Sequence, residues 1–463
     1  MNNGFIEVPD RPYHLSWDLT SVCDLHCSFC YDSAESGSCS TPAESKELIE
    51  LILKQIIELE PLHLGIGGGE PTKSPYLSYI LEFLYSQMRE KMPAITIDSM
   101  QLFSHPKLIL TARRINEALQ ENRVGFYLSI HGIGDVHDTI VGEKGHFVKQ
   151  MRAVQFLKES GVPFAIGVVP TQQNLNQLDR LVELAEGLGS GLLNISQFVE
   201  IGRGENGHNL NLTPPQYQSL LEWISKTNAR LGRRYVVTHE HWIAAYDYEM
   251  AKSDLFVGCS AGIYYLGVRS NGDIVPCQLN THVLGNVRNE TILDVWKNSP
   301  DLKRWRARDI DGPCRDCSLL FKCGGCRCNA VAADNGFLGS EPFCPVTKEL
   351  RHNATLSLEK QDSSTSQDDH DTRSHFYVTE ATIINPYVRP YTKQGDAICF
   401  RNDERDKFIK LSGCAKDIYL ISVEAKELTV EQLENHFQNK YTKAQILEEL
   451  EAMVKAGVIT CAQ

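Results

Sequence analysis

Eleven of the 15 cysteines fall into two groups whose spacing could carry metal chemistry. The first group is Cys23, Cys27 and Cys30, in the stretch CDLHCSFCYD, which follows the apolar YHLSWDL. Metal sites built from thiolates usually have four protein ligands. Three thiolates on one loop can bind three irons of a cubane cluster and leave the fourth iron open to a substrate or cofactor. Zinc, the alternative, would need a fourth ligand, for which the candidates are His26, Asp24 and Cys39.

The second group comprises eight cysteines in the C-terminal half of the chain, at Cys259, Cys277, Cys314, Cys317, Cys323, Cys326, Cys328 and Cys344. Thiolate chemistry alone does not separate zinc knuckles from iron–sulfur clusters here. Residues 255–350 are rich in glycine and cysteine and have little helix signal apart from LDVWKNSPDLKRWRARD. We therefore expect this segment to depend on bound metal for its fold. The four isolated cysteines are interpreted as buried or spare thiols, namely Cys39, Cys399, Cys414 and Cys461.

The composition is that of a soluble globular enzyme of two to four domains. The chain has 463 residues, of which 42% are hydrophobic, and a formal net charge of −13. The acidic balance argues against unspecific nucleic-acid binding. No secretory signal pattern opens the sequence, and no uninterrupted apolar run is long enough to span a bilayer. We expect a cytoplasmic protein without membrane or nucleic-acid partners, in which cysteines serve as metal ligands rather than disulfides.

The first half of the chain alternates between strands and amphipathic helices. Such alternation predicts an α/β fold with a parallel sheet, and six units predict a partial (β/α)6 TIM-like barrel with its functional residues at the C-terminal ends of the strands. The helix at 45–60 is expected to follow the capping residues Thr41-Pro42-Ala43-Glu44. The strand candidates are 13–19, 63–69, 94–100, 124–130, 164–170 and 192–199.

The end of the chain reads as a separate module. Residues 356–375 form an acidic polar linker, and 376–463 recover globular character. Three strand-like stretches, FYVTEATI, DAICFR and KFIKLS, precede three helical ones, CAKDIYLISVEA, VEQLENHF and KAQILEELEAMVKAG. This order predicts a small winged-helix-like α+β domain.

CDLHCSFCYD resembles the signature of the radical S-adenosylmethionine superfamily, and the resemblance extends over residues 13–235. It implies that residues 1–250 form the partial barrel and that Cys23, Cys27 and Cys30 hold one [4Fe-4S] cluster whose open iron binds S-adenosylmethionine. Cleavage of that cofactor would give a 5′-deoxyadenosyl radical. The resemblance also implies cofactor contacts from Phe29, Tyr31 and Ser129, and from the GGEP residues Gly68, Gly69, Glu70 and Pro71.

One segment departs from the family pattern. Many relatives have an arginine for the cofactor carboxylate where this chain has Val141, and Lys144 or Ser129 could compensate. The nearby histidines His131, His137 and His146 are interpreted as solvated or hydrogen-bonded residues rather than ligands.

The second cysteine group resembles the SPASM extension of radical S-adenosylmethionine peptide maturases, here residues 251–355. The resemblance implies two auxiliary iron–sulfur clusters, an outer [4Fe-4S] cluster and an inner cluster nearer the substrate. The spacing departs from the family pattern by one residue between Cys323 and Cys326. The outer ligands would be Cys314, Cys317, Cys323 and Cys344, and the inner ones Cys259, Cys277 and Cys326.

The stretch GGCRC contains an additional cysteine, Cys328, and resembles the pyrroloquinoline quinone maturase. The resemblance implies that Cys328 completes the inner cluster, which is then [4Fe-4S] or [2Fe-2S]; the alternative is a free thiol beside the cluster. Sulfatase maturases carry an aspartate directly after the residue equivalent to Cys277, whereas this chain has Gln278. Oxidation of a substrate residue to formylglycine is therefore not expected.

Residues 376–463 resemble the precursor-recognition element of ribosomal peptide biosynthesis, with a dimerisation or packing domain as the alternative. Together the resemblances imply a maturase that binds a precursor peptide through its leader and forms a C–C or thioether cross-link. They also imply an electron donor such as flavodoxin or ferredoxin. Two alternatives remain: an oxidative decarboxylase of a porphyrin-like molecule, and a non-catalytic iron–sulfur scaffold. The catalytic acid or base is not identifiable from sequence.

Overall fold

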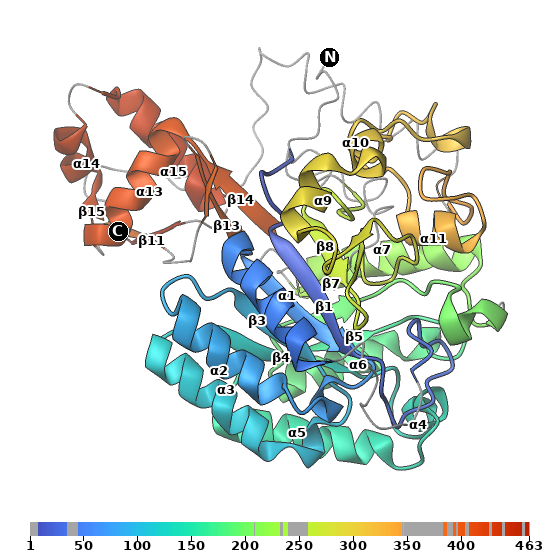
Figure 1. Ribbon diagram of the computed structural model, residues 1–463. Coiled ribbons are helices and arrows are strands. Elements are labelled where there is room, and N and C mark those ends of the chain that lie inside the picture. Colours follow the sequence, from blue (N-terminus) through green and yellow to red (C-terminus); the bar gives the residue numbers. More distant parts are fainter. Residues whose placement is uncertain are drawn as a thin grey trace. The chain divides into compact units, whose positions relative to one another are not determined.

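The computed structural model divides into two compact units, Met1–Asp362 and Ser363–Gln463. Each unit is described by itself (Figure 1). The described residues of the first unit are 8–34, 45–207, 209–231, 235–238, 258–344 and 346. Those of the second are 383–386, 392–394, 397–402, 407–425, 428–437, 440–455 and 459–462. The predicted linker at 356–375 and Cys39 therefore lie outside the described residues.

One large sheet organises the first unit. Among the described residues it has ten strands in the order β10-β9-β8-β1-β2-β3-β4-β5-β6-β7. The six predicted strands are present, all parallel and in sequential order, which confirms the partial barrel. A further strand, β7, Val236–Thr238, pairs in parallel with β6. The six are β1 His14–Thr20, β2 His63–Gly68, β3 Ala94–Asp98, β4 Val124–Ser129, β5 Phe164–Val168 and β6 Leu193–Ile195.

Helices between the strands cover the outside of this sheet (Figure 1). Helix α1 shows why: Ile52, Leu53 and Ile56 recur at helical spacing and are fully buried. The helix begins at Lys46, and the Ser45 hydroxyl caps it by accepting from the Leu48 N–H at 3.2 Å. The capping residues expected at 41–44 lie outside the described residues. The helices are α1 Lys46–Leu59, α2 Leu77–Met88, α3 Pro106–Leu119, α4 Asp135–Val141, α5 His146–Ser160, α6 Leu178–Leu188 and α7 Pro214–Leu231.

The cysteine-rich segment continues the same sheet. Strand β8, Tyr265–Val268, pairs in parallel with β1, and β9, Asp273–Val275, and β10, Gly285–Asn286, follow antiparallel. The short helices are α9 Ile292–Asn298, α10 Pro300–Arg306 and α11 Arg327–Ala332. Trp296 and Trp305 are buried in the core shared with the barrel. Apolar packing therefore supports this segment in addition to any bound metal.

The second unit contains the predicted helices. They are α13 Gly413–Ala425, α14 Val430–His436 and α15 Lys443–Lys455. Ile418, Tyr419 and Leu450 are buried between them. Two three-stranded antiparallel sheets complete the described part. One has the order β15-β11-β16, with β15 Leu428–Thr429, β11 Ile383–Pro386 and β16 Ile459–Ala462. The other has the order β12-β13-β14, with β12 Thr392–Gln394, β13 Ala397–Asn402 and β14 Lys407–Leu411.

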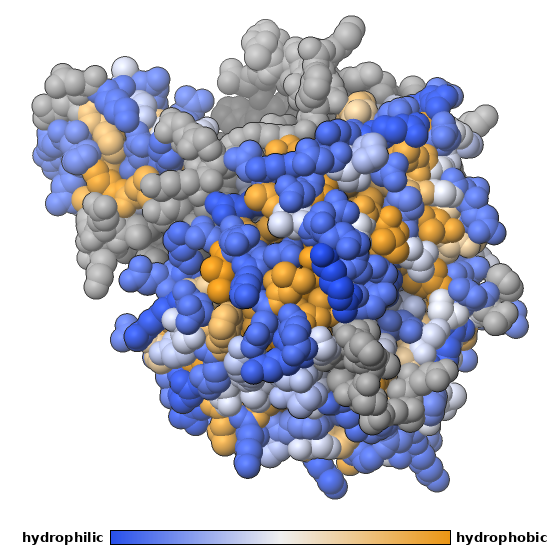
Figure 2. Space-filling model, viewed as in Figure 1, coloured by the Kyte–Doolittle hydropathy of each residue, from blue (hydrophilic) through white to orange (hydrophobic). Residues whose placement is uncertain are grey.

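The visible face of the first unit is mostly hydrophilic, and its apolar side chains form separate patches (Figure 2). Large apolar side chains that are exposed among the described residues lie on different elements: Tyr79, Leu110, Val148 and Val283. No helix in the described part of the chain has both the length and the apolar character needed to cross a bilayer.

Two helices of the barrel use an asparagine to fix the start of the next strand. The Asn116 amide of α3 donates to the Val124 carbonyl at 2.8 Å and accepts from the N–H groups of Arg123 and Val124 at 2.9 and 2.8 Å. Asn228 of α7 makes the same three bonds, to the backbone of Tyr235 and Val236. Each side chain satisfies three backbone groups that would otherwise be buried without a partner.

Replacing Asn116 by alanine should destabilise the first unit by about 2–4 kcal/mol, because several buried backbone groups lose their partner. Urea unfolding followed by tryptophan fluorescence measures this, since all five tryptophans precede residue 363. Gln87→Ala, at an exposed position of α2, is the control and should change the free energy of unfolding by less than about 0.5 kcal/mol. Equal stabilities of the two variants would contradict this account of Asn116.

Candidate cofactor and iron–sulfur sites

The loop that carries Cys23, Cys27 and Cys30 leaves the C-terminal end of β1. Cys23 is buried, and Cys27 and Cys30 are half-buried against Leu25 and Met100. The loop is fixed by its backbone, because the N–H groups of His26 and Ser28 donate to the carbonyls of Val141 and Ile140 at 3.2 and 3.0 Å. The end of α4 thus holds the loop in the place where many relatives have an arginine.

Arg203 is a residue of this site that sequence reasoning missed. Its Nε donates to the Cys27 carbonyl at 3.0 Å, and its Nη1 donates to the Ala34 carbonyl at 2.6 Å. The close approach depends on Gly202, which has φ +57°, because a Cβ there would lie 2.5 Å from the carbonyl oxygens of Cys30 and Tyr31. In the sequence, this contact is reflected only in the stretch GRG at 202–204, which matches no recognisable motif.

The three thiols have the properties expected of cluster ligands. Burial raises the pKa of Cys23 to about 11, and burial together with the neighbouring Cys30 and Cys23 raises the pKa of Cys27 to about 12. Crowded, buried thiols of this kind ionise only when a cation compensates them, as in metal sites. The donor set therefore fits an iron–sulfur cluster.

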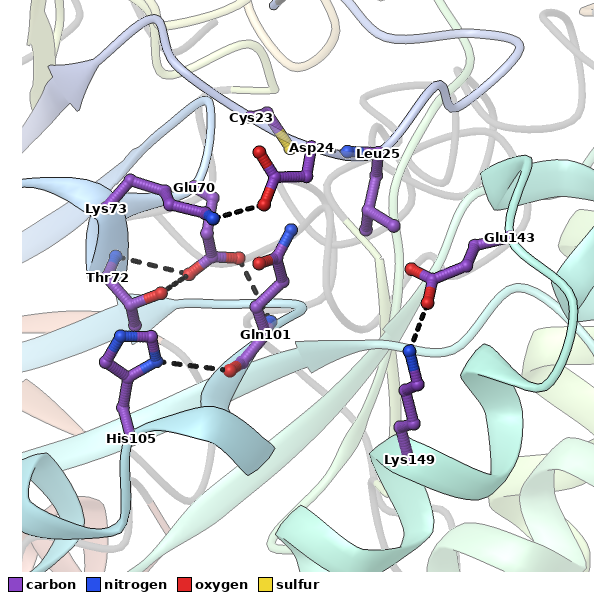
Figure 3. Close-up of polar contacts among 10 residues, drawn as sticks. All are labelled: Cys23, Asp24, Leu25, Glu70, Thr72, Lys73, Gln101, His105, Glu143 and Lys149. Carbon is purple, nitrogen blue, oxygen red and sulfur yellow. Dashed lines mark hydrogen bonds and ion pairs between the residues drawn. The ribbon is translucent and has the colours of Figure 1, made fainter. Parts of the chain in front are cut away.

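The geometry offers little to a single zinc ion. Within the described ranges, no three Cys, His, Asp or Glu side chains converge closely enough to hold one metal ion. Ligands of a cubane cluster bind different irons and so stand farther apart than the ligands of one ion. Of the candidates for a fourth zinc ligand, His26 is exposed, Asp24 forms an ion pair with Lys73, and Cys39 lies outside the described residues (Figure 3).

The GGEP segment follows β2 and runs along the cysteine loop. The N–H of Gly69 donates to the Thr20 carbonyl at 2.6 Å, and that of Glu70 donates to the Val22 carbonyl at 2.8 Å. A Cβ at Gly68, which has φ +107°, would lie 2.4 Å from the Thr20 oxygen, and one at Gly69 would lie 2.5 Å from the Val22 oxygen. Glycine is therefore required at both positions for the two loops to lie in contact.

The Glu70 side chain is occupied by the protein itself (Figure 3). One carboxylate oxygen accepts from the Thr72 N–H and hydroxyl and from the Ser99 hydroxyl at 3.2, 2.6 and 2.7 Å. The other accepts from the N–H groups of Met100 and Gln101 at 2.8 and 3.1 Å. A carboxylate has about four lone-pair sites. The predicted contact of this carboxylate with the cofactor would therefore displace a bond, whereas the backbone of the segment stays available. Pro71 is buried and begins the short 3₁₀ helix Pro71–Lys73.

A chain of three buried histidines connects the ends of β4 and β3. The His131 N–H donates to His137 Nδ1 at 3.1 Å, which places the His137 proton on Nε2. His137 Nε2 then donates to His146 Nδ1 at 2.9 Å, and His146 Nε2 donates to the Met100 carbonyl at 2.9 Å. Burial lowers the pKa of His131 to about 3 and that of His137 to about 2, so both rings are neutral. The three histidines are thus hydrogen-bonded residues, as the sequence suggested. The chain ends at the carbonyl of Met100, whose own N–H group binds Glu70.

The remaining predicted cofactor residues surround the mouth of the barrel. The Phe29 ring packs edge-on against His131, with ring centroids 4.9 Å apart. Ser129 is half-buried at the end of β4. Val141 is fully buried and Lys144 is exposed. The cofactor roles of these residues stay predictions.

Two carboxylates inside the barrel were not singled out from sequence. Asp18 of β1 accepts from the Tyr31 hydroxyl at 3.0 Å and lies 3.5 Å from the Arg269 guanidinium. Burial raises the pKa of Asp18 to about 6, and burial together with Glu70 raises the pKa of Asp98, at the end of β3, to about 7. In the sequence, each of them is recognisable only as an acidic residue near the end of a predicted strand. Such values suit groups that exchange protons near neutral pH.

The eight cysteines of the second group gather in two sets. Cys323 lies close enough to Cys344, Cys314 and Cys317 for their charges to raise its pKa, after burial as the main cause. In the other set, Cys328 hydrogen-bonds Cys277 and Cys326, and desolvation followed by the charge of Cys326 raises the pKa of Cys259 to about 11. These are the sets that the resemblance assigns to the outer and inner clusters. Thiol groups assembled in fours fit iron–sulfur clusters.

The inner set faces the barrel. Cys326 and Cys328 pack with Tyr31 and with Val199 and Ile201, which follow β6. Gln278, the residue after Cys277, accepts from the Ser16 hydroxyl of β1 at 2.8 Å. The polypeptide between Cys326 and Cys344 is fixed by Glu341, which is buried and accepts from the N–H groups of Cys326 and Phe343, both at 2.9 Å.

Comparisons with known proteins agree with this architecture. Residues 17–185 match the family model of the radical SAM superfamily, and residues 259–318 match that of SPASM, an iron–sulfur cluster-binding domain. The structure of Streptococcus suis SuiB bound to its precursor peptide SuiA shares the fold, with a TM-score of 0.58 and 20% identity, over 73% of this chain and 76% of that one.

Three curated relatives span most of their own length in the alignment. The AdoMet-dependent heme synthase of Methanosarcina barkeri is 23% identical and covers 73% of this chain and 98% of its own. The PqqA peptide cyclase of Granulibacter bethesdensis is 24% identical, with coverages of 73% and 88%. The mycofactocin maturase MftC of Mycobacterium ulcerans is 27% identical, with coverages of 74% and 92%. The chain is thus an enzyme with a radical SAM domain at residues 17–185 and a SPASM iron–sulfur cluster-binding domain at residues 259–318.

Proposed function

We propose that the enzyme modifies a ribosomally made precursor peptide and forms a C–C or thioether cross-link in it. The observation that carries the proposal is the combination of two sets of four cysteines, of which the inner one faces the barrel, with a separate α+β unit at 363–463. Relatives named as acting on peptides, PqqA peptide cyclase and SuiB, support a peptide substrate. We place the enzyme in the cytoplasm, where thiols stay reduced and flavodoxin or ferredoxin can supply electrons.

The proposed domains are a barrel at 1–250, a SPASM domain at 251–355 and a recognition element at 376–463. Cys23, Cys27 and Cys30 would hold a [4Fe-4S] cluster, and the second cysteine group would hold two auxiliary clusters. When bound, the reduced cluster and S-adenosylmethionine supply a 5′-deoxyadenosyl radical that abstracts hydrogen from the substrate. The chain would orient this cofactor with the Gly68–Gly69 backbone and with Phe29 and Ser129.

Cross-linking also requires that the substrate lose a proton. Asp18 and Asp98 are the carboxylates whose raised pKa values, about 6 and 7, support a role as acceptor. Both values follow mainly from burial toward the C-terminal ends of β1 and β3, where barrel enzymes place their catalytic groups. The electron that leaves with the proton would be taken by the iron–sulfur cluster that the inner cysteine set would hold, because that set packs on Tyr31, the hydrogen-bond partner of Asp18.

A second candidate function is oxidative decarboxylation of a porphyrin-like molecule. The similarity to an AdoMet-dependent heme synthase favours it. The C-terminal unit argues for the peptide, because small α+β modules can add an extended peptide to a sheet edge. A non-catalytic iron–sulfur scaffold would show iron and sulfide on analysis without forming deoxyadenosine.

Replacing Cys27 by alanine should abolish deoxyadenosine formation, since the radical-generating cluster would lose one of three ligands. The measurement is deoxyadenosine by liquid chromatography after anaerobic reconstitution and reduction. Cys414→Ala, which changes a buried thiol of α13, is the control and should cleave the cofactor at the wild-type rate. Unchanged cleavage in the Cys27 variant would refute the assignment of this loop as the site of the radical-generating cluster.

His137→Phe should weaken the binding of S-adenosylmethionine about tenfold, or 1.4 kcal/mol. The change breaks the hydrogen-bonded chain that orients the Met100 peptide, whose N–H group binds Glu70. Isothermal titration of the reconstituted enzyme gives the dissociation constant. His105→Ala is the matched control, because His105 contacts the neighbouring Gln101 carbonyl at 3.3 Å but lies outside the chain of histidines (Figure 3). Equal affinities of the two variants would refute the positioning role.

Deleting residues 376–463 should remove the affinity for the precursor peptide and leave cofactor cleavage intact. The probe is a short peptide encoded beside this gene, co-expressed with the enzyme and followed by mass spectrometry for the loss of two hydrogens. A truncated enzyme that still modifies the peptide at the full rate would contradict the recognition role of this unit, and a full-length enzyme that leaves the peptide unmodified would favour the small-molecule alternative.

A further inference from the structure

Arg308 is a buried cation whose charge is felt by one cysteine of each set in the SPASM segment. Its side chain is 3% exposed. Cys259 of the inner set and Cys323 of the outer set both interact with its charge. These two cysteines are themselves joined, because the Cys259 N–H donates to the Cys323 carbonyl at 3.1 Å. The guanidinium thus lies where the two sets meet.

Two glycines make this meeting point possible. A Cβ at Gly258, which has φ +66°, would lie 2.1 Å from the Cys323 carbonyl oxygen, so a side chain there would separate Cys259 from Cys323. A Cβ at Gly324, which has φ +73°, would lie 2.6 Å from Nη1 of Arg308 and 2.7 Å from the Trp305 ring. Both positions require glycine for steric space as well as for backbone conformation.

The backbone of Arg308 is also unusual. It has φ +55°, in the left-handed region, just after α10 ends. Glycine is the usual residue in this position, because a Cβ there is unfavourable by about 1 kcal/mol. Burial of a cation is a second unfavourable term. The Trp305 ring offsets part of it, since the guanidinium carbon lies 3.9 Å from the ring centroid. Arg308 therefore combines an unusual backbone conformation with a buried charge, and such outliers cluster at functional sites.

We propose that Arg308 is an electrostatic positioning residue for the two auxiliary iron–sulfur clusters and favours their reduced forms. The inference rests on the proposed cluster ligands. When a cluster gains one electron from a reductant, its negative charge rises by one, and no bond or proton need change. The permanent charge of a guanidinium stabilises the more negative state. Because Arg308 interacts with one ligand of each set, it should raise both midpoint potentials.

The test uses the full-length chain with Cys23, Cys27 and Cys30 changed to alanine, reconstituted anaerobically so that only the auxiliary signals remain. Arg308→Met and Arg308→Gln should lower the ratio of reduced to oxidised cluster at least tenfold at a fixed potential, which is about 59 mV for a one-electron couple. Arg308→Lys should restore values near those of the parent. Redox titration monitored by electron paramagnetic resonance gives the midpoint potentials.

Arg306→Met is the matched control. Arg306 is a half-buried cation, 4.1 Å from the Trp296 ring centroid, but partial burial alone lowers its pKa and no cysteine contributes. Both potentials should stay unchanged in this variant. An equal shift in the Arg306 and Arg308 variants would overturn the inference, as would unchanged potentials in both neutral Arg308 variants.

Iron content separates the remaining outcomes. If the parent chain binds no auxiliary clusters, the proposed ligands fail and with them the proposed function. If the Met and Gln variants lose iron while the Lys variant keeps it, the requirement for positive charge is supported. If all three lose iron, the role of Arg308 is one of shape and the electrostatic inference is wrong.

Discussion

The loop of Cys23, Cys27 and Cys30 imposes the main constraint on this structure, because crowded thiols must be held in a fixed arrangement without a regular element of their own. The protein meets that constraint with backbone hydrogen bonds from three directions. The end of α4, Arg203 and the Gly69–Glu70 segment each bind main-chain atoms of β1 or its loop. Side chains of the loop therefore stay available for the cluster. The glycines at 68, 69 and 202 are required for the same reason, since a Cβ at any of them would overlap the loop.

Glu70 and the three histidines likewise form hydrogen bonds that fix main-chain groups near the loop. Glu70 accepts five hydrogen bonds and thereby joins the ends of β2 and β3. The histidine chain reaches the same peptide from the other side, at the Met100 carbonyl. Because both histidine-to-histidine and histidine-to-carbonyl bonds use neutral rings, the arrangement keeps its form across the physiological pH range. Rigidity of this kind is what a site needs when it must align a reactive bond with its substrate.

The sequence was most informative where a pattern is periodic or a spacing is short. The alternation of strands and helices predicted the six parallel strands and the barrel, and the family models support both cysteine-rich segments. The sequence did not identify Ser45 as the cap of α1, because a capping residue is recognised by the backbone conformation at the start of the helix as well as by its type. It could not find Arg203, Arg269 or Arg308, since each acts on residues more than 30 positions away or through an unusual backbone angle. Asp18 and Asp98 can be read in the sequence, but only their burial, which raises their pKa values, distinguishes them from other acidic residues.

The pairing of β8 with β1 has a consequence for how the enzyme can move. His14 to Trp17 pair in register with Tyr265 to Val268, so the strand that ends in the first cysteine loop also carries the segment that leads to Cys277. A continuous sheet resists hinge motion between neighbouring strands. We therefore expect the two cysteine loops to keep a fixed separation, to which a flexible substrate would have to adapt if the clusters proposed for these loops start and finish the reaction.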